Sequence, residues 1–275
     1  ADVAPGSALA VEVDGTEESR TYDEMRVRSD RVANWLRDAG VRRGDAVMLM
    51  LDNRVELWEA MLAIMKLGAV ILPTSVVLGP DDLAERIERA GVRVVIADVA
   101  DAEKFDGLDP ELVRVVVGGD REGWASFTDA DAASDERPGV VVDSTDTAIV
   151  YFTSGTTSRP KMVEHTHVSY PVGHLSTMYW IGVRPGDVHM TISAPGWGKH
   201  AWSLFFSPWI AEATVFVYNY RRFDAVALAG ELDRAGVNTF CAPPTVWRML
   251  IQADLEHKPR ALRELLSAGE PLNPE

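Results

Sequence analysis

Short apolar runs of strand length alternate along the chain with longer segments of helical periodicity, and this rhythm constrains the fold more than any other feature. The runs are apolar throughout, not at every second position. Strands of this kind are buried on both faces, as in parallel sheets covered by helices on each side. The expected strands lie at residues 46–51, 69–73, 92–97, 112–117, 147–152, 187–194, 213–218 and 237–242.

Helix signals fill the gaps between these runs. Thr21 followed by Glu24 is a capping-box sequence that predicts a helix start, and Gly40 predicts the end of that helix. Pro244 predicts the first turn of another helix. Further helices are expected at residues 54–67, 81–90, 167–179, 197–209 and 224–235. The predicted fold class is α/β, with two layered subdomains of mostly parallel sheets flanked by helices.

One polar segment interrupts the rhythm. Residues 119–145 are rich in proline, glycine and aspartate, which makes this segment the best internal boundary. We therefore expect a first α/β subdomain over residues 1–143 and a second over residues 144–275. The chain does not begin with Met, so we expect it to be a piece of a longer protein.

Composition excludes several classes of protein. The formal net charge is −15, whereas a nucleic-acid binder shows a basic face. No apolar run reaches 18 residues, so no membrane span is expected, and the first residues do not resemble a secretory signal. Cys241 is the single cysteine, so a disulfide within the chain is excluded. A reducing, cytoplasmic location is therefore predicted.

The segment YFTSGTTSRPK, residues 151–161, follows an expected strand and carries the strongest chemical signal. Its hydroxyl groups and a permissive glycine fit a backbone turn that binds an anion, and Lys161 adds a positive charge. A plain turn rich in serine and threonine is the alternative interpretation. The order of strand, hydroxyl-rich turn, Pro-Lys and helix favours a triphosphate site. It is not the loop of P-loop NTPases, because no Gly-Lys-Ser/Thr occurs.

The stretch TSGTTSRPK resembles the phosphate-loop signature of the adenylate-forming superfamily, [ST]SG[ST]TGxPK, at eight of nine positions. That superfamily includes acyl-CoA synthetases, luciferases and adenylation domains of nonribosomal peptide synthesis. Ser158 replaces the usual glycine and Met162 another. The resemblance implies that the loop and its lysine hold the β- and γ-phosphates of ATP, and that Thr153 helps to ligate Mg²⁺. The loop residues are Thr153, Ser154, Gly155, Thr156, Thr157, Ser158 and Lys161.

Three further stretches are similar to the same superfamily. VEHTH, residues 163–167, resembles its continuation; we expect His165 and His167 to pack or cap the next helix rather than to bind metal. SAGEPLNPE, residues 267–275, resembles the adenine-binding turn of acyl-CoA synthetases. This implies that Gly269, Glu270 and Pro271 flank the adenine.

The acyl-pocket region of medium-chain acyl-CoA synthetases resembles residues 194–218 and 240–255. The resemblance implies that Trp197 shields the reacting carboxylate, and that Trp202 and Cys241 line an apolar acyl site. Core packing is the alternative for each tryptophan. Lys199 and His200 either contact a carboxylate or face solvent. Cys241 has no activating base nearby in sequence and is not expected to be a nucleophile.

By resemblance, the chain is the N-terminal part of an AMP-forming acyl-CoA synthetase of fatty acid metabolism. Such a protein joins a small or medium-chain acid to CoA, using ATP and Mg²⁺, with Lys161 and Trp197 at the reacting groups. The family's later parts include a Mg²⁺-binding glutamate, a ribose-binding aspartate, a hinge and a lysine of the C-terminal domain. These are expected after residue 275.

Other readings remain open at this point. An aryl-CoA ligase, or an adenylation domain that loads a carrier protein, would share the same loop. A nucleotide-binding module without chemistry is the alternative from another class, and Ser158 is in its favour. The sequence identifies neither the acid nor the oligomeric state.

Overall fold

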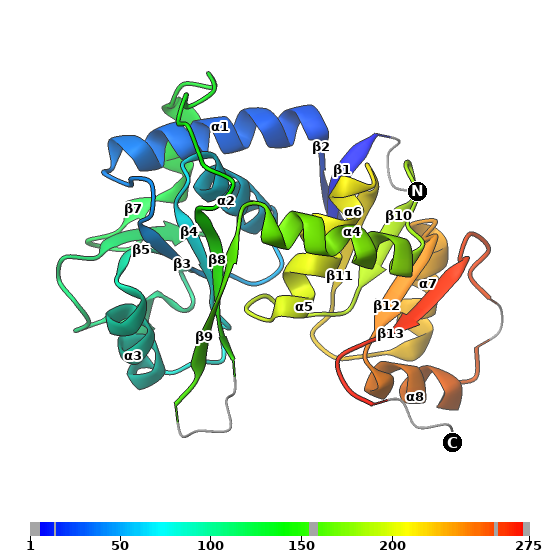
Figure 1. Ribbon diagram of the computed structural model, residues 1–275. Helices are drawn as coiled ribbons and strands as arrows, with labels where there is room; N and C mark the ends of the chain where they lie inside the picture. Colours follow the sequence, from blue (N-terminus) through cyan, green and yellow to red (C-terminus); the bar gives the residue numbers. More distant parts are fainter. Residues whose placement is uncertain (1–5, 14, 154–158, 256–257, 272–275) are drawn as a thin grey trace. The chain divides into compact units, whose positions relative to one another are not determined.

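The computed structural model describes residues 6–13, 15–153, 159–255 and 258–271, and the chain in it forms two compact units (Figure 1). Each unit is built around one sheet, of seven and six strands respectively. We name them the seven-stranded unit (Glu24–Tyr170 and Ala194–Gly198) and the six-stranded unit (Ala1–Asp23, Pro171–Ser193 and Lys199–Glu275).

The sheet of the seven-stranded unit has the strand order β7-β6-β5-β3-β4-β8-β9. Every pairing is parallel except the last, in which β9 runs antiparallel to β8. Parallel neighbours need a crossover, and helices or loops on the sheet faces supply it. The strands are β3 (Ala46–Met50), β4 (Val70–Pro73), β5 (Val92–Asp98), β6 (Val113–Val117), β7 (Ala125–Ser126), β8 (Thr147–Thr153) and β9 (Lys161–Thr166).

Both faces of this sheet are covered, which explains why its central strands are apolar throughout. On one face Met48 and Met50 of β3 pack in a cluster with Leu83 and Ile87 of α3. The intervening Leu49 is also buried, so the other face is covered as well. The helices of this part of the chain are α1 (Tyr22–Asp38), α2 (Val55–Lys66), α3 (Pro80–Ala90), η1 (Ala102–Phe105) and η2 (Phe127–Ala132).

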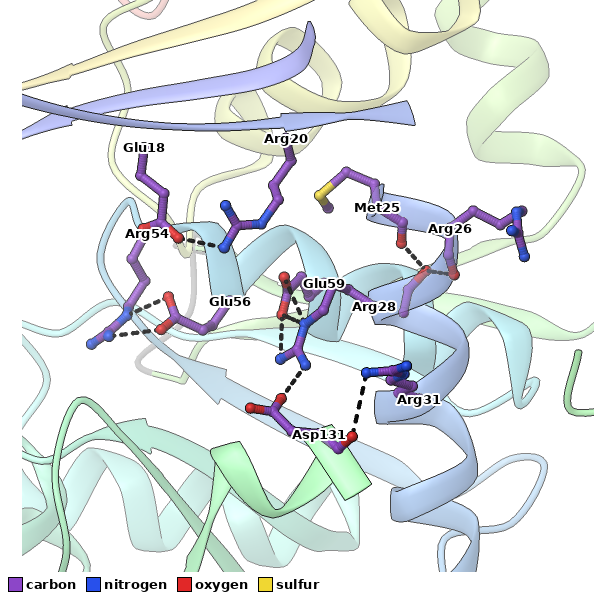
Figure 2. Close-up of polar contacts among 11 residues, drawn as sticks. Glu18, Arg20, Met25, Arg26, Arg28, Arg31, Arg54, Glu56, Glu59 and Asp131 are labelled. Atoms are coloured by element: carbon purple, nitrogen blue, oxygen red, sulfur yellow. Dashed lines mark hydrogen bonds and ion pairs between the residues drawn. The ribbon is translucent and has the colours of Figure 1, made fainter. Parts of the chain in front are cut away.

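An ionic network attaches η2 to the long helices of the seven-stranded unit. Arg28 of α1 donates to the buried carboxylate of Glu59 in α2 at 3.2–3.3 Å and also bonds Asp131 in η2 (Figure 2). Arg31 donates to the backbone carbonyl of Asp131 at 3.3 Å. The polar segment 119–145 is therefore held onto α1 and α2 by charge-assisted hydrogen bonds.

The six-stranded unit has the strand order β13-β12-β10-β11-β1-β2. Its pairings are parallel except for β1 with β2, which form an antiparallel hairpin. The strands are β1 (Ser7–Val13), β2 (Thr16–Thr21), β10 (Val188–Thr191), β11 (Thr214–Asn219), β12 (Thr239–Ala242) and β13 (Glu264–Ser267).

Two apolar clusters cover the sheet of this unit. In one, Leu228 and Leu232 of α7 pack with Phe216 and Phe240 of the sheet. In the other, Ile181 of α4 packs with Cys241 and Leu266. The helices are α4 (Ser169–Ile181), α5 (Gly198–Ala201), a π-helical turn (Trp202–Phe206), α6 (Ser207–Ile210), α7 (Ala225–Arg234) and α8 (Pro244–Gln252). Within the described part of the chain, no helix is long and apolar enough to cross a membrane.

The α/β class and the mostly parallel sheets are confirmed, but two hairpins were not predicted. The helix expected at residues 167–179 corresponds to α4, but the strand β9 (Lys161–Thr166) that precedes it was not predicted. Residues 7–21 form β1 and β2, for which no strand was predicted. The predicted boundary between residues 143 and 144 cuts the chain once, whereas each unit takes segments from both sides of that point.

His189 lies in the core of the six-stranded unit as a neutral ring. It is fully buried in β10, with Nδ1 2.7 Å from the Thr239 hydroxyl and Nε2 2.9 Å from the Thr191 hydroxyl. Burial lowers its pKa to about 4. In the unfolded chain the pKa of histidine is about 6.5. Below pH 6.5 the unfolded state therefore binds a proton that the folded state does not, and stability falls as the pH falls towards 4.

We predict that lowering the pH from 7 to 5 removes about 2 kcal/mol of unfolding free energy through His189 alone. The variant His189→Gln keeps polar atoms for the two threonines but cannot titrate. Its free energy of unfolding in urea should therefore depend less on pH than that of the wild type. Equal slopes for the two proteins would contradict the assignment.

Candidate functional site

The hydroxyl-rich segment lies in the sequence between β8 and β9, which pair at the edge of the seven-stranded sheet. β8 and β9 pair so that Thr153 lies directly opposite Lys161. The Thr153 hydroxyl donates to the Lys161 carbonyl at 3.5 Å, and both residues are exposed. The predicted phosphate-binding residues Ser154, Gly155, Thr156, Thr157 and Ser158 lie outside the described residues.

Two arginines of α3 contact both ends of this loop. Arg86 and Arg89 each place the guanidinium carbon over the ring of Phe152, 4.8 and 5.2 Å from its centroid. Arg89 also donates from Nη2 to the backbone carbonyl of Pro160 at 2.8 Å. Phe152 precedes Thr153 and Pro160 precedes Lys161, so the contacts lie next to the two predicted phosphate contacts.

His165 packs against an aromatic pair. Its ring lies 4.5 Å from that of Tyr170 and 6.1 Å from that of Tyr151. The two tyrosine hydroxyls are 3.0 Å apart, and burial raises the pKa of Tyr170 to about 12. Burial lowers the pKa of His167, whose backbone N–H bonds the Asp146 carbonyl. No group of three or more potential metal ligands occurs among the described histidine, cysteine and carboxylate residues.

Trp197 stands on a short segment of the seven-stranded unit that approaches the backbone of Ser75 closely. Gly196 has φ +91°, and a Cβ at this position would lie 2.5 Å from the backbone nitrogen of Ser75. The carbonyl of Gly198 accepts a hydrogen bond from Tyr170 at 3.4 Å. The indole of Trp197 is 64% exposed, so core packing does not account for it.

In the six-stranded unit, the predicted acyl-site residues come together. Trp202 packs against the apolar cluster that contains Cys241 and Ala268. Lys199 donates from Nζ to the Ala268 carbonyl at 2.9 Å. Burial lowers the pKa of the Lys199 ammonium, while the Cys241 thiol raises it. Burial also raises the pKa of the Cys241 thiol, so this cysteine is suited to packing rather than to nucleophilic attack.

The sequence allowed two interpretations of Lys199 and His200: each either contacts a carboxylate or faces solvent. His200 does not face solvent, because it is only 3% exposed and burial lowers its pKa to about 3. Lys199 is partly buried and is bonded to a backbone carbonyl, so it does not stand free in solvent either.

The predicted adenine turn is fastened to the start of α8. Glu270 Oε1 accepts hydrogen bonds from the Thr245 hydroxyl at 2.6 Å and from the Thr245 backbone N–H at 3.1 Å. These bonds lower the pKa of Glu270. Gly269 has φ +116° with open space around it, and Pro271 is exposed. The Glu270 side chain therefore caps the first turn of α8, and the backbone beside Gly269 stays open to a flat ligand.

The predicted site residues are divided between the two units. Thr153, Lys161 and Trp197 belong to the seven-stranded unit. The other group belongs to the six-stranded unit, where the Lys199–Ala268 bond links the acyl-site cluster to the adenine turn; it comprises Lys199, Trp202, Cys241, Gly269, Glu270 and Pro271. Arg86, Arg89 and Thr245 were missed, because each supports the site from a helix distant in sequence.

Comparison with known proteins gives a consistent result. A family model described as "AMP-binding enzyme" matches residues 1–275. The 4-hydroxybutyrate–CoA ligase 1 of Metallosphaera sedula is 40% identical over 265 residues, which are 95% of this chain and 46% of that protein. The mitochondrial acyl-coenzyme A synthetase ACSM3 of Homo sapiens is 35% identical over 272 residues, 95% of this chain and 46% of that protein.

Solved structures share the fold. The crystal structure of a Brucella canis acyl-CoA synthetase aligns with a TM-score of 0.86 at 28% identity, covering 98% of this chain and 51% of that one. The acetoacetyl-CoA synthetase from Streptomyces lividans aligns with a TM-score of 0.88 over 98% of this chain and 45% of its own, but at 20% identity it shows the fold alone. The chain thus spans about half the length of the relatives that it matches.

We predict that Gly196→Ala destabilises the protein by about 2 to 4 kcal/mol, because the added methyl group meets the Ser75 backbone at a positive φ. Gly198→Ala is the matched control. A Cβ there has no neighbour within 4 Å and lies in α5, so this change should not destabilise. Urea unfolding of both variants measures the difference, and equal stabilities would contradict the close approach.

Proposed function

Since the chain belongs to the family of AMP-binding enzymes, we propose that its protein is an AMP-forming acyl-CoA synthetase. Its substrates would be a small or medium-chain carboxylic acid, ATP and CoA. The observation that carries the proposal is the hairpin in which Thr153 and Lys161 close a TSGTTSRPK loop. The names of the relatives, an acyl-coenzyme A synthetase and a 4-hydroxybutyrate–CoA ligase, support the same reaction class.

In the first proposed step, a carboxylate oxygen of the acid attacks the α-phosphorus of ATP. The bond to the bridging oxygen breaks, which releases pyrophosphate and leaves an acyl-adenylate. Charge accumulates on the departing pyrophosphate, and a fixed cation next to it lowers the barrier. We assign this role to Lys161, which is exposed at the start of β9. The loop hydroxyls and amides would hold the β- and γ-phosphates in line.

The other predicted residues would hold the two remaining parts of the acyl-adenylate. Gly269, Glu270 and Pro271 would frame the adenine, with the Glu270 carboxylate holding the turn in place through Thr245. Trp202 and Cys241 would line the acyl chain, and the exposed Trp197 would shield the carboxyl group. Lys199 would hold the Ala268 carbonyl and so keep the adenine turn next to the acyl site.

In the second proposed step, the CoA thiolate attacks the acyl carbon and AMP leaves. Magnesium would neutralise charge on the phosphates in the first step. The Thr153 hydroxyl can supply one oxygen ligand, since its single described bond is long, at 3.5 Å. Phosphate oxygens of ATP and the glutamate expected after residue 275 would supply further ligands.

The apolar acyl-site cluster favours an alkyl acid over a strongly polar one. It includes Trp202, Cys241 and Leu266. The single cysteine supports the proposed cytoplasmic location, although the human relative is named as mitochondrial, and cell fractionation would decide between the two. With an alkyl acid as substrate, the proposed reaction would activate fatty acids for metabolism.

We predict that the full-length protein catalyses carboxylate-dependent exchange between ATP and pyrophosphate. The panel of acids runs from acetate to decanoate and adds 4-hydroxybutyrate and benzoate. Exchange that peaks with an alkyl acid, followed by thioester formation when CoA is added, is the expected result. A peak with benzoate would favour an aryl-CoA ligase, and ATP binding without exchange would leave a nucleotide-binding module.

We predict that Lys161→Ala lowers the rate of this exchange by about a hundredfold, because the departing pyrophosphate loses a fixed positive charge. The control is Lys258→Ala, which removes an exposed lysine outside the proposed site. The measurement is the steady-state exchange rate at saturating acid. An unchanged rate in Lys161→Ala would reject the role of this residue.

A further inference from the structure

We propose that Arg89, supported by Arg86, is a positioning residue for adenylation. It fixes the two strand ends that carry Thr153 and Lys161 and so sets where the Lys161 ammonium meets the phosphates. The inference rests on the proposed function. It concerns two residues of α3 that the sequence did not single out; Arg89 lies 71 positions before Pro160.

Arg89 uses its planar fork in two directions. Nη1 donates to Glu85 Oε1, one helical turn earlier in α3, at 2.9 Å. Nη2 donates to the carbonyl of Pro160 at 2.8 Å. The first bond orients the guanidinium along the helix, and the second holds the residue immediately before Lys161. A lysine offers one ammonium in place of this rigid fork, so it cannot reproduce both contacts at once.

The other end of the loop is held through the ring of Phe152. Arg86 and Arg89 both stack on this half-buried ring, and their guanidinium carbons lie 4.8 and 5.2 Å from its centroid. Burial lowers the pKa of Arg86, because desolvation disfavours its charged form. Cation–π contacts of partly desolvated arginines are among the stronger ones. Phe152 is therefore fixed to the same helix as Pro160.

Because β8 and β9 are paired, the contacts of α3 with Phe152 and with Pro160 together constrain the position of Lys161. Phe152 lies opposite Met162 and Thr153 lies opposite Lys161 in the β8–β9 ladder. Helix α3 is itself anchored in the core by Leu83 and Ile87. The position of Lys161 thus depends on a rigid helix rather than on the edge strand alone. In an edge hairpin, this link limits movement of the lysine relative to the sheet.

The test compares Arg89→Met with Arg89→Lys in the full-length protein. Methionine keeps the aliphatic stem but removes the donor and the charge. We expect Arg89→Met to raise the KM for ATP and for pyrophosphate about tenfold in the exchange reaction, with the KM for the acid unchanged. Arg89→Lys should recover part of this loss. Thioester formation from synthetic acyl-adenylate and CoA, which involves no pyrophosphate, should stay at the wild-type rate.

Arg93→Met is the matched control, because Arg93 is an exposed arginine on β5 whose nearest carboxylate is 3.9 Å away. Its kinetics should equal those of the wild type. Equal kinetics of Arg89→Met and wild type, or an equal loss in both half-reactions, would overturn the positioning role. If Arg89→Met does not fold, Arg86→Met takes its place with the same readouts. A wild-type protein that shows no exchange with any acid would instead reject the proposed function itself.

Discussion

The pairing of β8 with β4 is the constraint on which the rest of the phosphate-loop hairpin depends. Ile149 of β8 lies opposite Ile71 of β4, and both side chains are fully buried. Burying an isoleucine contributes roughly 1.5–3 kcal/mol, so this position fixes the strand firmly in the sheet. β8 runs parallel to β4 and ends at Thr153. Ligands of α/β sheets bind beyond the carboxyl ends of such strands. The edge strand β9 has no other described strand to pair with, and α3 supplies its second attachment.

The central strands could be predicted from the sequence because burial on both faces leaves a direct compositional record. Ala46–Met50 is buried at every position, and its letters contain no polar residue. Two of the missed strands, β9 and β2, are not marked by burial, whereas the missed β1 is buried at all but its last position. β9 reads KMVEHT and β2 reads TEESRT, both largely exposed edge strands. Their strand conformation comes from pairing with a buried neighbour, which no local pattern reveals.

The candidate site shows the same division. Thr153, Lys161, Trp197 and Gly269 stand in recognisable motifs, so they could be predicted as site residues from the sequence. Arg89 and Thr245 act through long-range contacts, to Pro160 and to Glu270 respectively. Arginine is common on exposed helix faces, so the sequence of α3 does not indicate that Arg89 contacts Pro160. The motif of Glu270 did not predict that its carboxylate also binds the start of α8.

The π-helical turn Trp202–Phe206 has a consequence for comparing relatives. A π turn accommodates one residue more than an α turn, and an α-helix rotates by about 100° per residue. The turn therefore resets the rotational phase between Lys199, which bonds the Ala268 carbonyl, and Trp209, whose indole N–H bonds the Ala8 carbonyl at 2.9 Å. A relative with one residue fewer at this point can keep both contacts only if its alignment gap falls within residues 202–206. Any other placement of the gap would equate side chains that point in different directions.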